Sequence, residues 1–335
     1  REGGTGMEKR IFGRTGLELA VLGFGCGAVG GLMVRGDAAE QERTVADALA
    51  AGINYFDTAV QYGDGQSERN LGRVLRSLGA TDAIVGTKVR LTAAERGDIA
   101  GAIVRSLDGS LARLGRDRVD ILYLHNPVTA EGNGSTLTAA TVLAEVVPAI
   151  ARLRAAGKVR FLGITAVGDT DALKRVVTSG EIDAAQVVFN LLNPSSAAAP
   201  PLAAGPSDQD YGGLLGVAAA AGVGTVGIRV LAGGALSGEA ERHPVASPAP
   251  APIGSSPSYA LDLDRARRLG PIVADGHAAS LAEAATRFAA WHSGLGTILV
   301  GMASREQFHA ALAAVRRGPL PAEALERLGE LARGV

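Results

Sequence analysis

Four side chains that can exchange protons lie at or just after the ends of apolar runs in this chain. Asp57 ends the apolar part of "INYFDTA", Lys88 lies in "GTKV" and His125 lies in "LYLHN". Tyr62 follows five residues after Asp57, in the glycine-rich stretch "QYGDG". An acid, an amine, an imidazole and a phenol that share one pocket are able to hold and transfer a proton. The chemistry therefore depends on whether the fold brings these four residues together.

Each of the four residues also has an ordinary structural explanation. Asp57 can cap a loop, Lys88 can be a strand-end lysine, and Tyr62 can be a surface tyrosine. His125 alone is typical of a core histidine whose hydrogen bonds are satisfied. The repeated position at the ends of successive apolar runs is what favours a shared site.

The apolar runs that carry these residues predict strands that alternate with helices. The predicted strands are 20–26, 53–59, 83–89, 119–126, 159–165, 184–190, 224–231 and 296–302. The predicted helices are 37–52, 67–79 with Ser67 as its N-cap, 98–115, 138–157, 170–179, 211–222, 262–275, 281–293, 304–317 and 321–333. Near-continuous apolar strands separated by helices indicate a parallel sheet covered by helices.

Eight evenly spaced units favour an α/β fold of the (β/α)8 barrel type, with an open doubly wound sheet as the alternative. Segment 9–20, "KRIFGRTGLELA", predicts a β-hairpin that caps the bottom of the barrel. Extra helices are expected after the last strand. Polar residues at the C-terminal strand ends of such a barrel face one site, so Asp57, Lys88 and His125 are expected to meet there.

Two long irregular stretches fall on the same face of the predicted barrel. They are 195–210, after the sixth strand, and the Pro/Ala/Ser-rich stretch 243–258, after the seventh. Stretch 243–258 is too long for a simple connection, so it is interpreted as either an active-site lid or a disordered loop. Such loops are where barrel enzymes vary their choice of substrate.

The composition restricts the function further. The chain has 335 residues, is 47% hydrophobic and carries a net charge of −1, so neither nucleic acid nor a membrane is an expected partner. Its single cysteine, Cys26, excludes a disulfide within the chain and a Cys-rich zinc site, and no metal site is expected. We expect a cytoplasmic protein, as a monomer or homo-oligomer, with one domain at 7–335; residues 1–6 are interpreted as an artificial extension left from expression.

The stretch "FDTAVQYGDGQSERNLG" resembles the signature of the aldo-keto reductase family. The similarity continues from "RIFGRTGLELAVLGFGCGAVGG" through "VDILYLHNP" and "AAQVVFNLLNP" to "LVGMASREQF", over about residues 8–315. This resemblance implies a (β/α)8 barrel that binds NADP, with NAD as the alternative, at its C-terminal face. It implies an NAD(P)-dependent oxidoreductase that reduces aldehydes and ketones, or acts in reverse, including on sugars.

The resemblance identifies Asp57, Tyr62, Lys88 and His125 as a catalytic tetrad. In these roles Tyr62 gives the proton, and Lys88 lowers the pKa of a phenol that is ordinarily about 10. Asp57 holds Lys88 charged and in place, while His125 donates a hydrogen bond to the substrate oxygen. In the reverse direction Tyr62 is the base.

The resemblance also implies a set of cofactor contacts. Gln186 matches the glutamine that binds the nicotinamide carboxamide, and Thr165 stands where the family has serine. The other matched positions are Gly25, Cys26, Asp57, Ile228, Arg229, Leu231, Gly233, Leu236, Gly238, Gly301, Ser304, Arg305 and Gln307.

The chain departs from the family pattern at the adenosine end of the cofactor. The arginine of the family's adenosine motif is Ala303, and a Glu-Asn pair is replaced by Ala310 and Ala311. Either Arg305 substitutes for the missing arginine or the cofactor is NAD. Two other functions remain open from the residues, namely a redox sensor or regulatory subunit and an unrelated phosphate-binding barrel. The intact tetrad argues against the first, and the signature argues against the second.

Overall fold

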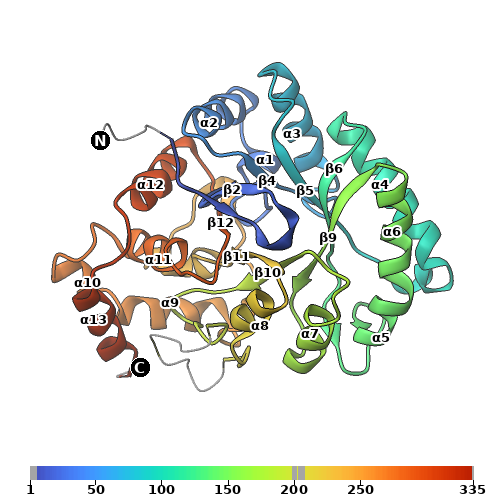
Figure 1. Cartoon of the computed structure of the whole chain (residues 1–335). Coiled ribbons are helices and arrows are strands. Elements are labelled where there is room, and N and C mark those ends of the chain that lie inside the picture. Colours follow the sequence, from blue (N-terminus) through green and yellow to red (C-terminus); the bar gives the residue numbers. More distant parts are fainter. Residues whose placement is uncertain (1–5, 198–201, 203–207, 334–335) are drawn as a thin grey trace.

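The computed structural model describes residues 6–197, 202 and 208–333, and its central feature is a closed barrel of eight strands (Figure 1). Each strand pairs in parallel with its neighbours. The barrel strands are β3 (Leu22–Gly25), β4 (Tyr55–Asp57), β5 (Ile84–Val89), β6 (Val119–Leu124), β9 (Val159–Ala166), β10 (Ala184–Val188), β11 (Gly224–Ile228) and β12 (Thr297–Gly301). Because β12 pairs with β3, the barrel prediction is confirmed and the open sheet is wrong.

The helices form an outer ring around these strands (Figure 1). They are α1 (Leu32–Arg35), α2 (Ala38–Ala50), α3 (Gln66–Ser77), α4 (Ile99–Leu114), α5 (Ala139–Thr141), α6 (Val147–Ala155), α7 (Thr170–Val177), α8 (Leu214–Ala220), α9 (Tyr259–Arg268), α10 (Pro271–Ala274), α11 (Leu281–Ala290), α12 (Arg305–Arg316) and α13 (Ala322–Arg333). Within the described ranges, no helix has the length and apolarity to cross a membrane.

Short elements also appear that the sequence did not predict. Two-residue strands β7 (Val128–Thr129) and β8 (Leu137–Thr138) pair in parallel, and a 3-10 turn covers Ala93–Asp98. The predicted helix 262–275 is divided into α9 and α10. The expected artificial extension at 1–6 falls largely outside the described residues, as does much of stretch 195–210.

The N-terminal hairpin consists of β1 (Lys9–Ile11) and β2 (Glu18–Ala20), which pair antiparallel. Its fully buried Phe12 and Leu19 belong to one apolar cluster with Val226 of the barrel interior. A Cβ atom at Gly224 would lie 2.7 Å from the Phe12 ring, so glycine at the start of β11 gives that ring its space. The hairpin therefore closes the N-terminal end of the barrel, as predicted.

The start of α3 differs from the prediction because Ser67 is not its N-cap. The helix begins at Gln66, after Gly65, whose φ of +78° suits glycine. Ser67 is instead fully buried, and its hydroxyl donates a hydrogen bond of 2.8 Å to the Cys26 carbonyl. The same hydroxyl lies 2.8 Å from the hydroxyl of Thr58. These contacts hold α3 against the ends of β3 and β4.

The next residue, Glu68, carries a buried charge that joins three elements. Its carboxylate has no exposed side-chain surface and accepts hydrogen bonds of 2.6 Å from Thr87 of β5 and from Arg113 of α4. Removal of one partner of a buried pair leaves the other charge poorly solvated, which destabilises a fold strongly.

We expect Glu68→Ala to lower the free energy of unfolding by about 3 kcal/mol, because Arg113 then loses its buried partner. Chemical denaturation followed by circular dichroism measures this change. The control is Arg105→Ala, which removes an exposed ion pair with Asp98 and should cost less than about 1 kcal/mol. Equal costs for the two variants would contradict an anchoring role for Glu68.

Candidate active site

A cavity of about 660 Å³ opens at the C-terminal ends of the barrel strands. Asp57, Tyr62 and His125 line it near the strand ends, and Gln307 of α12 lines it toward the helix ring. Lys88 is not part of the lining, since it is 99% buried, but its ammonium lies 4.9 Å from the centre of the Tyr62 ring. The structure thus brings all four predicted residues together.

A buried ion pair joins Lys88 to Asp57. Lys88 Nζ lies 2.5 Å from Asp57 Oδ2 and donates a second hydrogen bond of 2.9 Å to the Thr58 carbonyl. The Tyr62 and His125 rings meet edge to face, with centres 6.0 Å apart. The phenol therefore lies between an ammonium and an imidazole.

Three further side chains complete this site, and sequence reasoning gave two of them no role there. Asp57 Oδ1 accepts a hydrogen bond of 2.5 Å from Gln186 Nε2 and one of 3.2 Å from the Tyr55 hydroxyl. The hydroxyls of Tyr55 and Tyr123 lie 3.0 Å apart. Tyr55 precedes Asp57 by two residues on β4, and this spacing places both side chains on one face of the strand. That spacing is the signal that identifies Tyr55.

The charge of Lys88 survives its burial. Burial alone lowers the pKa of a lysine, but Asp57 and Tyr62 act against it and the pKa of Lys88 is raised above its ordinary value. The side chain is therefore an ammonium throughout the physiological range.

The pKa of Tyr62 does not behave as the sequence predicted. Burial raises it, and although the Lys88 charge lowers it, the result lies above the ordinary value of a phenol. The direction of the lysine effect was predicted correctly, but the net lowering of the pKa was wrong, because the cost of burying a phenolate is larger. Tyr62 is thus a phenol that keeps its proton at neutral pH.

His125 is neutral for the same physical reasons. Burial lowers its pKa from 6.5 to about 3, and the charges of Lys88 and Arg90 add to that effect. Its Nδ1 atom lies 3.0 Å from Oε1 of Gln61, a residue that sequence reasoning did not single out. Gln61 therefore fixes the orientation of the ring.

Many of the predicted cofactor positions line the cavity. They are Gly25, Asp57, Thr165, Gln186, Ile228, Arg229, Leu231, Gly233, Gly301 and Gln307. The predicted positions outside the lining are Cys26, Leu236, Gly238, Ser304 and Arg305.

Two of the positions outside the lining have structural partners of their own. Arg305 forms an ion pair with Asp47 of α2, with Nε 2.6 Å and Nη2 3.1 Å from its carboxylate oxygens. Ser304 caps α12, since its hydroxyl accepts a hydrogen bond from the backbone N–H of Gln307. Arg305 thus faces α2 rather than the cavity.

Features of the cavity wall fit a dinucleotide. The buried Thr165 hydroxyl has no hydrogen-bond partner in the described part of the chain, although such groups are ordinarily paired. Gly233 and Gly234 have φ values of +71° and +108° and present backbone without side chains to the cavity. Arg229 adds a guanidinium to the same wall. An unpaired hydroxyl, bare backbone and a cation suit a carboxamide and a diphosphate.

The stretch 243–258, which was interpreted as either a lid or a disordered loop, is an ordered wall of the cavity. Ala246 and Ile253 line it. Arg242 donates hydrogen bonds of 2.8 Å to the Gly233 carbonyl and 3.0 Å to the Ala246 carbonyl. Arg35 of α1 reaches the Val245 carbonyl at 2.8 Å. These two arginines fasten the stretch across the glycine turn.

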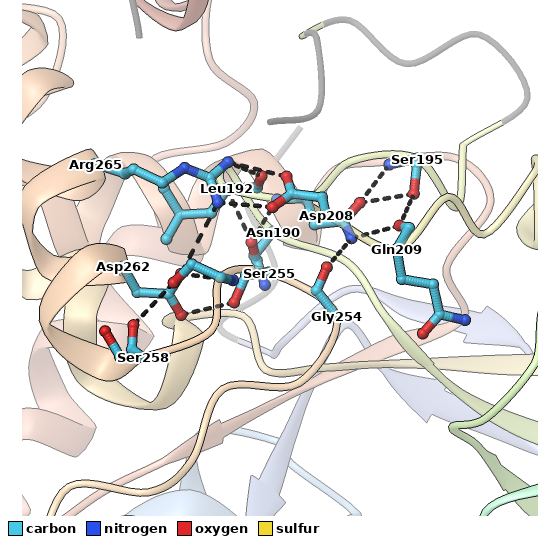
Figure 2. A network of polar contacts seen from close by, with 12 residues as sticks. Asn190, Leu192, Ser195, Asp208, Gln209, Gly254, Ser255, Ser258, Asp262 and Arg265 are labelled. Carbon is cyan, nitrogen blue, oxygen red and sulfur yellow. Dashed lines mark hydrogen bonds and ion pairs between the residues drawn. The ribbon is translucent and has the colours of Figure 1, made fainter. Parts of the chain in front are cut away.

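A polar network fixes the other end of this stretch (Figure 2). Asp262 of α9 accepts hydrogen bonds of 2.6 Å from Ser255 and 2.7 Å from Ser256. Arg265, one turn later, binds Asp208 through two hydrogen bonds of 2.7 and 2.9 Å. Asn193 donates to the Gly254 carbonyl at 2.5 Å. Helix α9 thus holds the loops after β10 and β11 together at the rim.

Comparisons with known proteins agree with this geometry. L-galactose dehydrogenase of Arabidopsis thaliana is 30% identical over 320 residues, which cover 93% of this chain and 89% of the relative. Pyridoxal 4-dehydrogenase of Microbacterium luteolum is 29% identical, with 90% of each chain covered. The structure of an aldo-keto reductase from Bacillus halodurans superposes with a TM-score of 0.72 over 98% of this chain and 97% of that one, at 24% identity, which shows the shared fold.

The sequence profile of the Aldo/keto reductase family matches residues 21–333, nearly the whole chain. The family and its named dehydrogenases support carbonyl oxidoreduction with a nicotinamide cofactor. The protein therefore belongs to the aldo/keto reductase family and is an NAD(P)-dependent oxidoreductase.

Proposed function

We propose that Tyr62 is the general acid and base of this oxidoreductase, and that the protein oxidises a cyclic hemiacetal to a lactone with NAD as cofactor. The observation that carries the proposal is the buried Lys88–Asp57 pair, whose ammonium lies 4.9 Å from the Tyr62 ring at the wall of the cavity. A phenol beside a fixed positive charge can give up and regain a proton without a second titrating group.

When bound, NAD(P) gives or accepts the hydride. The protein residues then handle the proton. In oxidation the Tyr62 oxygen takes the proton of the substrate hydroxyl, and in reduction the phenol returns it to the carbonyl oxygen. Lys88 stabilises the phenolate form, and Asp57 keeps Lys88 charged. Each direction therefore moves one hydride and one proton.

His125 orients the substrate oxygen as a neutral group. A neutral imidazole avoids a second positive charge beside Lys88, which would repel it. Oε1 of Gln61 lies 3.0 Å from Nδ1 of His125 and holds the ring beside the cavity.

The substrate proposal rests on the names of two relatives. One acts on L-galactose and the other on pyridoxal, as their names state. In water, both compounds close to cyclic hemiacetals, in which a single carbon bears the hydroxyl and the hydrogen. When the hydrogen on this carbon leaves as a hydride and the hydroxyl loses its proton, the product is a lactone. Tyr62 at the cavity wall is suited to take this proton.

The preference for NAD is inferred from the cavity wall between α11 and α12. Among the described residues of these two helices that line the cavity, Glu283 is the only charged one, and it is acidic. Ala310 and Ala311 lie at the same end, and Arg305 is held by Asp47. The 2′-phosphate of NADP would find no cation among the residues of these two helices that line the cavity, whereas the 2′-hydroxyl of NAD needs none.

A first prediction concerns the pH dependence of the two directions. Because burial raises the pKa of Tyr62, the phenolate fraction increases with pH through the whole neutral range. The rate of hemiacetal oxidation should therefore rise with pH between about 6 and 10, while aldehyde reduction should not. Single-turnover experiments measure both rates, since NADH absorbance appears during oxidation and disappears during reduction. Tyr62→Phe should lose at least about 100-fold in each direction, and full turnover in that variant would disprove the role.

A second prediction concerns the cofactor. NADH should bind at least about 10-fold more tightly than NADPH, a difference of about 1.4 kcal/mol, as measured by the fluorescence of the bound dihydronicotinamide. Arg305→Ala should leave both affinities unchanged, because its guanidinium is committed to Asp47. Ala310→Arg, which adds a cation to the cavity wall, should reduce the difference in affinity between NADH and NADPH. Tighter binding of NADPH by the unmodified protein would contradict the proposal.

A third prediction concerns the charge of His125. With its pKa near 3, the ring should show no titration between about pH 5 and 8 in NMR spectra of the imidazole nuclei. His125→Gln identifies its signals by their loss, and free histidine in the same buffer shows that titration is visible. A midpoint above about pH 5 would rule out the neutral role.

A further inference from the structure

A second cavity, of about 330 Å³, lies beside the first one. Gln61 and Arg90 line it, together with Thr92 and Ser135. Gln61 also lies 3.0 Å from Nδ1 of His125, which lines the first cavity. Gln61 therefore links the lining of the second cavity to His125 in the first.

The walls of the second cavity are held in place by buried hydrogen bonds. The Asn126 side chain is fully buried; it accepts a hydrogen bond of 2.8 Å from the Leu91 amide and donates one of 2.8 Å to the Leu91 carbonyl. It also donates to the Ser135 carbonyl at 3.0 Å. Arg96 fastens the same loop through the carbonyls of Asn133 and Thr136, each at 2.6 Å. The cavity is thus a built feature between the loops after β5 and β6.

Two of the polar side chains that line this cavity already form hydrogen bonds within the protein. The Thr92 hydroxyl donates to Glu95 at 2.7 Å, and the Ser135 hydroxyl donates to Asn133 at 3.0 Å. Within the described residues, the Arg90 guanidinium has neither an ion pair nor a hydrogen bond, and the Gln61 amide nitrogen has no acceptor. The groups left for a ligand are therefore donors, and one carries a full positive charge.

The position of Arg90 connects it to the reaction centre. Arg90 is the first residue after β5, and its exposed side chain lines the second cavity. After burial and Lys88, the charge of Arg90 is the third cause of the low pKa of His125. Arg90 is thus an exposed cation at the mouth of the barrel, on the side of His125.

We propose that the second cavity binds the anionic end of the substrate, a carboxylate or a phosphate, through Arg90 and the Gln61 amide, while the hemiacetal carbon lies at Tyr62. This inference rests on the proposed function and extends it to a substrate class, the acidic sugars. A guanidinium without an acidic partner favours an anion over a neutral hydroxyl, because hydrogen bonds between charged groups are the stronger ones. The matching ligands are uronic acids and aldose phosphates.

The test compares sugars that differ only in charge. Initial rates with saturating NAD+ are measured for galactose, galacturonate and galactose 6-phosphate, and for glucose with its two acidic counterparts. In the unmodified protein, an acidic sugar should exceed its neutral partner in kcat/KM by about 10-fold or more. Arg90→Gln should lower this ratio by about 10- to 100-fold, mainly through KM, and Arg90→Lys should restore part of it. The uronate and phosphate arms show which anion the cavity takes.

The control variant is Arg105→Gln, which removes an exposed cation on α4 and should leave the ratio unchanged. Equal kcat/KM values for acidic and neutral sugars would overturn the anion site but leave the hemiacetal proposal standing. Loss of turnover for every sugar would instead contradict the proposed function. In that case calorimetric titration measures the affinity of the same six sugars. The anion site is disproved if no acidic sugar binds more tightly than its neutral partner. It is also disproved if Arg90→Gln leaves the affinity difference between acidic and neutral sugars unchanged.

Discussion

The buried ion pair of Lys88 and Asp57 is the constraint on which the rest of the site depends. Two charges inside a barrel cost free energy unless their remaining hydrogen-bonding atoms are also satisfied. Gln186 meets this need from β10 and Tyr55 meets it from β4, while Lys88 also binds the Thr58 carbonyl. Strands β4, β5 and β10 therefore meet at one carboxylate, and the ammonium has a single position from which to act on Tyr62.

A fixed ammonium also determines the protonation of its neighbours. The same burial that makes the ion pair necessary raises the pKa of Tyr62 and lowers that of His125. Near neutral pH the site consequently holds a charged Lys88, a protonated Tyr62 and an uncharged His125. Tyr62 lies beside the ammonium and lines the cavity, so the phenol is placed to exchange a proton while the neutral His125 is not, which separates the roles of these two residues.

The barrel and the meeting of Asp57, Tyr62, Lys88 and His125 in one place were predictable because both depend on local pattern. Asp57 ends an apolar run, Tyr62 lies among glycines, and the eight runs alternate with helices. Tyr55 and Tyr123 were missed, since a tyrosine within an apolar run has the pattern of a core aromatic and only the fold shows what its hydroxyl meets. The partner of Arg305 was equally hidden, because Asp47 lies 258 positions away in the chain. The pKa of Tyr62 depends on the depth of its burial, which no spacing of residues reveals.

The end of β6 shows how the fold separates chemistry from substrate choice. His125 faces the first cavity, and the next residue, Asn126, turns the other way and clamps the loops after β5 and β6. One short segment after β6 therefore contributes both to the wall of the first cavity and to the hydrogen bonds that shape the second. The side chains on that cavity, Arg90 among them, make no contact with the Asp57 carboxylate in the described structure. Changes there can alter the substrate while the ion pair and the phenol stay as they are.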